Sequence, residues 1–216
     1  MKLLKSGAGK ALWRRTMLFD PGPRLRMIIG ERRTVAGFSA APDMKLFNRL
    51  IRKRKSMTES EPVRKAIATA ERRAGALVHT ASIYGLYQPD SQIQTRFPDA
   101  VYAALALVTI GSELEDEVAQ LSSAGDTSAA FLLDAWGSAF VEGAVEVIDA
   151  IIRREAQSLG LDGGKRRSPG YPPWGLEEQA TIIHRLDGSI IGVRLTDTHT
   201  MLPRKSVSFG IPFSRP

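Results

Sequence analysis

One long helix is the feature that most constrains the fold of this chain. Asp126 is a favourable N-cap residue, the helical stretch continues to about Leu159, and Gly160 is a typical stop signal. A helix of this length needs an extended partner surface on which to bury one side. The rest of the sequence must therefore supply that surface.

The residues just before this helix predict a strand and a second helix. Val101–Ile110 has the aliphatic content of a buried strand. Ser112, followed three residues later by Glu115, has the pattern of a capping box that begins a shorter helix.

The order of elements along the whole chain predicts an α+β fold, with an antiparallel or mixed twisted sheet and helices packed against one face. We expect a strand pair over Leu25–Ser39 that turns near Gly30, helices over Asp43–Lys55 and from Glu61 to about Ala74, a β-like segment over Ala76–Tyr87, a loop over Gln88–Pro98, a short helix within Gly175–Leu186, and strands over Ile190–Thr196 and Ser206–Ile211.

The net charge of +7 is unevenly distributed. Residues 1–57 contain 15 Lys and Arg against three acidic residues, a balance of +12, whereas the remainder carries −5. We therefore divide the chain into a basic N-terminal extension, 1–57, and a second domain, 58–216. The run Arg52, Lys53, Arg54 and Lys55 could dock an acidic partner or could be a solvated face. The basic end could also contact nucleic acid nonspecifically, but the acidic remainder makes nucleic-acid binding an unexpected role.

Several kinds of site are not expected. The chain has no cysteine, which excludes disulfides and thiolate ligands and suits a reducing cytoplasm. Its histidines, His79, His184 and His199, lack metal-ligand spacing. No apolar run reaches the roughly 18 to 20 residues of a membrane span. The SGAGKA stretch lacks the earlier glycine and the hydroxyl residue of a phosphate-binding loop.

The segment RRSPGY, residues 166–171, has the composition of a small-ligand site. The forks of Arg166 and Arg167 match a carboxylate or phosphate. Gly170 permits unusual backbone conformations, and Tyr171 offers an aromatic face with a polar tip. A small zwitterionic ligand would suit this combination. The alternative interpretation is a surface turn before a helix.

These residues carry a resemblance to a known family. Arg166, Gly170 and Tyr171 match the Arg-x-x-x-Gly-Tyr element of the S-adenosylmethionine (AdoMet) binding activation domain of cobalamin-dependent methionine synthase and its stand-alone relatives. A second family motif is matched, in order, by Gly192–Thr198, Met201, Pro203 and Ser206–Ser208. The resemblance covers about Val101–Pro216, and residues 1–57 show none.

The resemblance also implies roles for individual residues. Arg166 matches the arginine that holds the AdoMet carboxylate, Gly170 and Tyr171 complete the same cofactor-binding element, and Glu142 matches a ligand-contacting glutamate on a helix. Asp134, Ser138 and Glu142 are spaced by four residues and so share one helix face. Gly137 and Gly143 keep that helix thin and permit close approach of another group.

Three departures from the family pattern stand out. Asp197 replaces a common glutamate, and Phe209 interrupts the Ser-Val-Ser-Gly element. The chain ends at Pro216, before the position of a further ligand-contacting tyrosine, so we expect that contact to be missing or replaced.

By this resemblance, we expect a protein of methionine biosynthesis that binds AdoMet and supports reductive reactivation, by methylation, of a cobalamin or corrinoid cofactor. The corrinoid would be carried by a partner, either methionine synthase or another corrinoid-binding protein, with a flavodoxin-like electron donor. No homocysteine, folate or cobalamin domain is recognisable, so we expect an accessory to methyltransferase activity rather than a complete enzyme. The alternative is a non-catalytic AdoMet-binding regulatory subunit of another corrinoid-dependent methyl-transfer system.

Overall fold

The computed structural model describes residues 27–52 and 60–216. Its centre is a five-stranded sheet with the order β1-β2-β3-β7-β4, in which every pair of neighbouring strands is antiparallel. The predicted α+β class is confirmed. The strands of the sheet are β1 (Arg32–Ala36), β2 (Ala81–Tyr87), β3 (Tyr102–Thr109), β4 (Asp162–Gly163) and β7 (Ser206–Ser214).

The strand β3 lies at the centre of the sheet and is buried on both faces, as its aliphatic content predicts. Alternate residues face opposite sides of a sheet. On one face, Ala104, Ala106 and Val108 join the larger apolar core. On the other, Leu105 and Leu107 join a smaller core. The sheet therefore needs cover on both sides.

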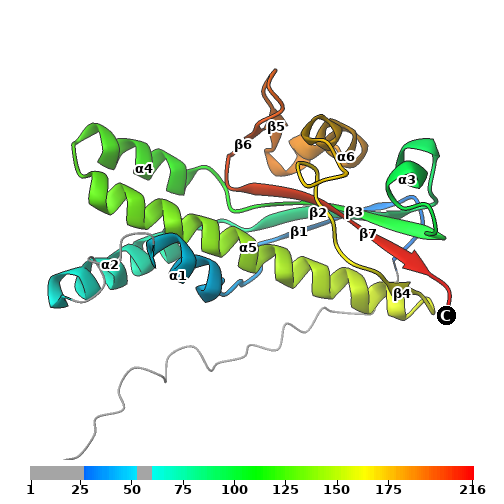
Figure 1. Ribbon diagram of the computed structural model, residues 1–216, viewed down its shortest axis with the longest axis horizontal. Coiled ribbons are helices and arrows are strands. Elements are labelled where there is room, and N and C mark those ends of the chain that lie inside the picture. The colour runs from blue at the N-terminus through cyan, green and yellow to red at the C-terminus, as the bar shows by residue number, and fades with distance from the viewer. Residues whose placement is uncertain (1–26, 53–59) are drawn as a thin grey trace, which may run out of the picture.

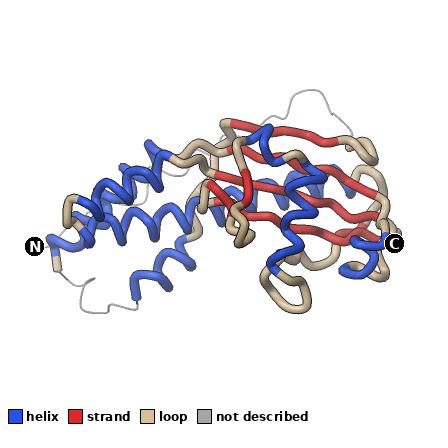
Figure 2. The backbone as a smooth tube through the Cα atoms, turned by 90° about the horizontal axis from the view of Figure 1, so that it is seen from above, coloured by secondary structure: helices blue, strands red, loops and turns tan. Residues whose placement is uncertain are grey.

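The larger core lies between the sheet and four helices (Figure 1). The long helix α5 crosses the sheet and extends beyond it, together with α2 and α4, so that the helices project past one end of the strands (Figure 2). Phe47 stacks on Trp136 with ring centroids 3.7 Å apart, which fixes α1 on α5. The four helices are α1 (Met44–Arg52), α2 (Glu61–Leu77), α4 (Glu113–Ser123) and α5 (Thr127–Gln157).

Shorter helices cover the second face, contrary to the prediction that helices pack on one face alone. Trp174, Ile182 and Leu186 bury the residues that β2 and β3 turn to this side. Sequence reasoning predicted the short helix within Gly175–Leu186 but missed the one within Gln88–Pro98, which is too short for strong periodicity. They are α3 (Ser91–Arg96), η2 (Leu176–Glu178), α6 (Gln179–Leu186) and η3 (Gly188–Ile191).

The helix α3 lies inside the segment predicted as a loop. The carboxylate of Asp90 caps it by accepting a hydrogen bond from the backbone N–H of Ile93 at 3.0 Å. That bond, and then the side chain of Arg185, hold the pKa of Asp90 below its ordinary value, despite opposing desolvation. A single cap therefore suffices to begin a helix that carries little periodic signal.

Two helix starts test the cap predictions. Asp126 caps α5 as predicted, accepting from Ala129 N at 3.0 Å. The predicted capping box of Ser112 and Glu115 is wrong, because Ser112 has helical backbone angles and makes no side-chain cap bond. Glu115 instead accepts a hydrogen bond from the backbone N–H of Lys205. Its carboxylate therefore ties the start of α4 to the loop before β7.

Residues 27–52 pack into the same body as the rest of the described chain. In the described part of the predicted strand pair over Leu25–Ser39, one strand, β1, pairs with β2 at the edge of the sheet, and Ile29 adds an isolated bridge to Leu86. Phe38 and Phe47 are buried in the larger core. The functional division at residue 57 stays a prediction. Residues 1–26 and the basic positions Lys53, Arg54 and Lys55 lie outside the described residues.

The C-terminal segment differs from its prediction in one place. The expected strand over Ile190–Thr196 is replaced by η3 and a two-stranded ribbon of β5 (Arg194–Leu195) and β6 (Met201–Leu202). The expected strand over Ser206–Ile211 is present as β7. The left-handed backbone at Gly192, with φ of +72°, separates the helical turn from the ribbon.

Gly137 and Gly143 do permit close approach to α5, and the approaching groups belong to the protein itself. A Cβ at Gly143 would overlap the backbone carbonyl of Ala41. A Cβ at Gly137 would press on the side chain of Leu114. These glycines therefore let the segment before α1 and the helix α4 pack against α5.

We predict that Gly143→Ala lowers the free energy of unfolding by about 1–3 kcal/mol or more, because the backbone of Ala41 must move to admit the methyl group. The matched control is Gly75→Ala in α2, where the nearest atom to a new Cβ is 3.9 Å away. This substitution should stabilise by about 0.5–1 kcal/mol, since alanine favours the helix. Chemical denaturation measures both, and equal effects would contradict the packing account.

Candidate functional site

A row of polar side chains follows one side of α5. Two cations reach it from elsewhere in the chain, Arg166 from the segment after β4 and Lys205 from the loop before β7. We call this group the polar edge; it consists of Asp134, Ser138, Glu142, Glu146, Arg166 and Lys205. The predicted sharing of one helix face by Asp134, Ser138 and Glu142 agrees with these contacts.

Arg166 is bound by two glutamates one helical turn apart. Its Nη2 atom lies 2.8 Å from Glu142 Oε1 and 3.0 Å from Glu146 Oε1. Its guanidinium also lies 5.4 Å from the ring centroid of Phe209, which gives it an apolar backing. Nε and Nη1 make no hydrogen bond to the described residues, so these two donors stay available to an anion.

The two carboxylates and the guanidinium together suit a zwitterion. A ligand carboxylate can accept a bond from Nε or Nη1 of Arg166, while Glu142 and Glu146 can accept from an ammonium group. The side chains of Arg166 and Glu142 are 23% and 31% exposed, so the pair is screened only partly and remains reachable. The donor set therefore fits the amino-acid end of a small molecule.

The backbone decides which of the two neighbouring arginines joins the polar edge. Arg167 exchanges two backbone hydrogen bonds with Gly210, of 2.9 and 2.8 Å, which continues the edge of the sheet beside β7. Successive side chains there face opposite sides. Arg166 accordingly lies over Phe209 in the larger core, whereas Arg167 lies over Phe97 on the other face.

Gly170 and Tyr171 form a tight turn next to this segment. Gly170 has a φ of +86°, and its N–H donates to the carbonyl of Trp174 at 2.9 Å. Tyr171 is 74% exposed and presents its ring to solvent. Gly170 is thus required by the backbone conformation. A substituent there would also crowd Leu176, at 3.3 Å.

The structure therefore brings two of the four predicted site residues into contact. Glu142 and Arg166 form an ion pair, and Gly170 and Tyr171 are neighbours in the turn. In the described part of the chain, no hydrogen bond or ring contact joins the side chain of Tyr171 to the Arg166–Glu142 pair. Their cooperation in one ligand site stays a prediction.

Sequence reasoning missed two members of the polar edge. Glu146 could have been found, because it follows Glu142 by the same four-residue step. Lys205 carried no such signal. Its Nζ atom lies 2.7 Å from Asp134 Oδ1 and 2.9 Å from Ser138 Oγ, a contact made across 67 or more residues of sequence.

The described residues form neither a metal site nor a membrane-spanning helix. Among residues 27–52 and 60–216, no group of three His, Asp or Glu side chains is arranged to hold a metal ion. His79 instead pairs with Glu113 at 2.8 Å. None of the helices in the described ranges has the length and apolar character needed to cross a membrane.

Comparisons with known proteins agree with this picture. The family model described as "Vitamin B12 dependent methionine synthase, activation domain" matches residues 88–216, more than half of the chain. The match includes all four predicted site residues. No curated protein matches the sequence.

A solved structure has a similar fold. It is the crystal structure of the MetH reactivation domain bound to AdoHcy, with a TM-score of 0.65 and 16% sequence identity. The alignment covers 87% of this chain and 78% of that one. It therefore extends upstream of the region that the family model matches.

Proposed function

The chain belongs to the family of the vitamin B12 dependent methionine synthase activation domain, and from this premise we propose that it binds AdoMet along the polar edge and presents the methyl group to a corrinoid carried by a partner protein. The observation that carries the proposal is the position of Arg166 between Glu142 and Glu146, with its Nε and Nη1 atoms making no hydrogen bond to the described residues. The ligand bound to the similar MetH domain, AdoHcy, has the same amino-acid end as AdoMet, which supports this choice.

The amino-acid end of AdoMet fits the charges of the site. Its ammonium would replace part of the contact that Glu142 and Glu146 make with Nη2, and its carboxylate would then accept from Nη2 together with Nε or Nη1 of Arg166. A ligand that supplies both charges leaves each protein charge paired. The pairing limits the desolvation free energy of the protein and ligand charges. A simple anion or cation would leave one side of the cluster unpaired.

Tyr171 would hold the other end of the ligand. Its exposed ring can stack on the adenine base or lie against the sulfonium, and the left-handed backbone at Gly170 sets the direction of the turn that carries it. Because no contact in the described chain joins Tyr171 to Arg166, the ligand itself would span the two.

The bound molecules would carry out the chemistry, and the chain would hold AdoMet in position. The partner's corrinoid supplies a reduced cobalt centre that accepts the methyl group of AdoMet. The chain's residues would anchor the amino-acid end and leave the methyl group accessible at an open edge of the sheet. We propose that the chain serves methionine synthase or another corrinoid protein in this way, with electrons from a flavodoxin-like donor.

The central test is calorimetric titration with AdoMet. Arg166→Ala should weaken binding by about 2–4 kcal/mol, a factor of about 30 or more, because a bidentate charge-assisted contact is lost. The matched control is Arg167→Ala, which removes the same charge one residue away on the opposite face of the sheet.

We expect the control to bind AdoMet like the unmodified chain, and both variants to remain folded by circular dichroism. Equal losses of AdoMet affinity in the two variants would show that the effect comes only from the change in net charge. A larger loss in Arg167→Ala would place the site on the other face.

Gly170→Ala should impair AdoMet binding more than folding. Any alanine with a positive φ costs about 1 kcal/mol of stability, so a control with the same backbone cost is needed. Gly125, between α4 and α5, has a φ of +83° and nothing within 4 Å of a new Cβ. Thermal melts should shift similarly for both alanine variants, and titration should show weaker binding for Gly170→Ala alone. Full affinity in Gly170→Ala would make that glycine structural only.

A turnover assay separates delivery of the methyl group from regulation. We expect the chain, mixed with AdoMet and a chemically reduced corrinoid protein, to accelerate formation of AdoHcy, and Arg166→Ala to abolish the acceleration at limiting AdoMet. Tight AdoMet binding without any acceleration would instead support the regulatory alternative.

A further inference from the structure

The polar edge has a second charged end, formed by Asp134, Ser138 and Lys205. Lys205 Nζ lies 2.7 Å from Asp134 Oδ1 and 2.9 Å from Ser138 Oγ. Asp134 precedes Glu142 by eight residues on the same side of α5, and at about 1.5 Å of rise per residue this separates the two side chains by about 12 Å along the helix. The helix therefore fixes the spacing between this end and the end at Arg166.

This spacing matches the distance between two polar parts of AdoMet. A chain of about eight bonds joins the ammonium nitrogen to a ribose hydroxyl oxygen and spans about 9 Å when it is extended. A hydrogen bond of about 2.8 Å at each end brings the reach to about 15 Å. A ligand with its ammonium group at Glu142 can therefore place its ribose beside Asp134 in a slightly bent conformation.

Lys205 is held in place by its backbone as well as by its side chain. Its N–H donates to the carboxylate of Glu115, and its carbonyl accepts from the N–H of Ile110 at 3.2 Å. Its side chain lies across α5 at Gly137, where a new Cβ would be 3.3 Å from Lys205 Cε, and is only 13% exposed. The ammonium group is thus fixed beside Asp134, unlike that of a freely solvated lysine.

Asp134 keeps one carboxylate oxygen for a ligand. Lys205 engages Oδ1, whereas Oδ2 makes no hydrogen bond to the described residues and is not buried. The side chain as a whole is 49% exposed. A carboxylate oxygen can accept hydrogen bonds from the hydroxyls of a vicinal diol, and an acidic side chain binds the ribose in dinucleotide-binding folds. This end of the polar edge therefore suits ribose hydroxyls.

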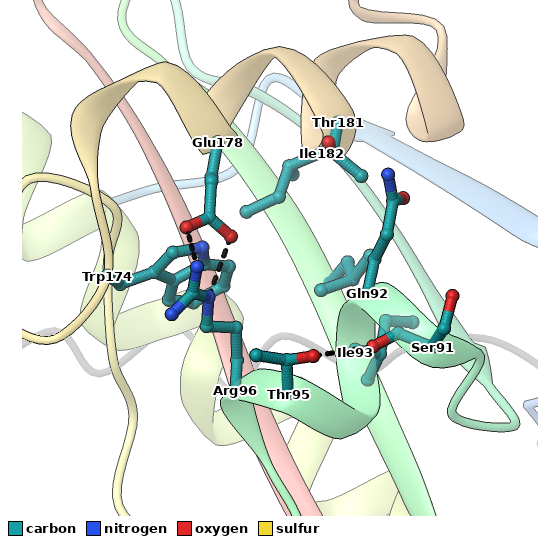
Figure 3. A pocket seen from close by; sticks show the side chains of 10 residues that line it. Ser91, Gln92, Ile93, Thr95, Arg96, Trp174, Glu178, Thr181 and Ile182 are labelled. Carbon is teal, nitrogen blue, oxygen red and sulfur yellow. Dashed lines mark hydrogen bonds and ion pairs between the residues drawn. The ribbon is translucent and has the colours of Figure 1, made fainter.

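The hollow between α3 and α6, on the opposite face of the sheet, offers no such carboxylate (Figure 3). Among the described residues that line it, Glu178 is the only acidic one, and both of its oxygens accept from Arg96. A ribose that bound Glu178 would have to displace this ion pair. Asp134 is the better partner, because its Oδ2 atom can accept without any such displacement.

We propose that Asp134 binds the ribose hydroxyls of AdoMet, and that Lys205 is a positioning residue that holds the Asp134 carboxylate in place. The proposal rests on the proposed function and assigns the nucleoside end of the same site. It makes the polar edge selective for a ribonucleoside joined to an amino acid over a dideoxynucleoside analogue. Tyr171 would keep its contact with the base or the sulfonium.

The test compares two ligands by calorimetric titration of the full chain. AdoHcy carries both ribose hydroxyls and its 2′,3′-dideoxy analogue carries neither, whereas their amino-acid ends are identical. The variant is Asp134→Asn, and the matched control is Asp187→Asn. Asp187 is also an ion-paired aspartate, with 47% of its side chain exposed, but it follows α6 on the opposite face of the sheet. Asparagine tolerates the left-handed backbone at this position, where φ is +56°.

We expect the unmodified chain and Asp187→Asn to bind AdoHcy about 10-fold or more tightly than the dideoxy analogue, the usual effect of a hydrogen bond to a charged group. In Asp134→Asn this ratio should fall towards one, because AdoHcy loses affinity and the analogue does not. Lys205→Met should lower the ratio in the same direction while circular dichroism reports an unchanged fold. A merely structural role of either residue would weaken both ligands equally and leave the ratio unchanged.

Two results would overturn the inference. The unmodified chain could bind both ligands equally well, or Asp134→Asn could leave the ratio of affinities unchanged. Failure of the proposed function gives a different pattern, in which AdoHcy does not bind at all or binds equally well to Arg166→Ala. If the proposed function is correct, Arg166→Ala weakens both ligands to the same extent and preserves their ratio.

Discussion

The burial of α5 against the sheet is the constraint on which the other features depend. Ile148 and Ile152 are fully buried in the core that also holds Phe209, Ile211 and Phe213 of β7. Once this contact fixes the rotation of the helix, Glu142 and Glu146 must lie where Arg166 can reach them. The rotation of α5 is also fixed by close packing at Gly137 and Gly143. The side chain of Leu114 and the backbone of Ala41 occupy the space that a Cβ at these positions would need.

The edge of the sheet then divides one short segment between two environments. Pairing with β7 at Gly210 sends Arg166 to the α5 side and Arg167 to the side of α3 and α6. A few residues later, Trp174 packs into the smaller core. A segment of nine residues therefore contributes to the polar edge and to the smaller core on the opposite face; alternation along an extended backbone separates Arg166 from Arg167, and the turn at Gly170 and Tyr171 leads to Trp174.

The parts of the fold that could be predicted carry strong local signals. The long helix, the buried strand β3 and the cap at Asp126 follow from periodicity, aliphatic content and a single favourable residue. The second helical layer was predicted only in part, because the short helix expected within Gly175–Leu186 is present as α6, whereas α3 is six residues long and carries too little periodicity. Ser112 fails as a cap because its backbone is helical, and Glu115 accepts instead from the backbone N–H of Lys205, a tertiary contact that no local pattern reveals.

In the candidate site, too, local patterns predict some residues, and tertiary contacts decide the others. A four-residue step on a helix places Glu142 beside Asp134 and Ser138, and would have placed Glu146 as well. The choice between Arg166 and Arg167 is a matter of register with β7, which the sequence alone does not determine. Lys205 enters the polar edge only through the folded loop before β7.

A crystal structure of the full chain with AdoMet would show directly where the ligand binds. We predict the amino-acid carboxylate within hydrogen-bonding distance of the Arg166 guanidinium and the ammonium group beside Glu142 and Glu146, with Tyr171 against the rest of the ligand. AdoMet bound on the opposite face, between α3 and α6, with the Arg166–Glu142 pair undisturbed, would contradict this prediction.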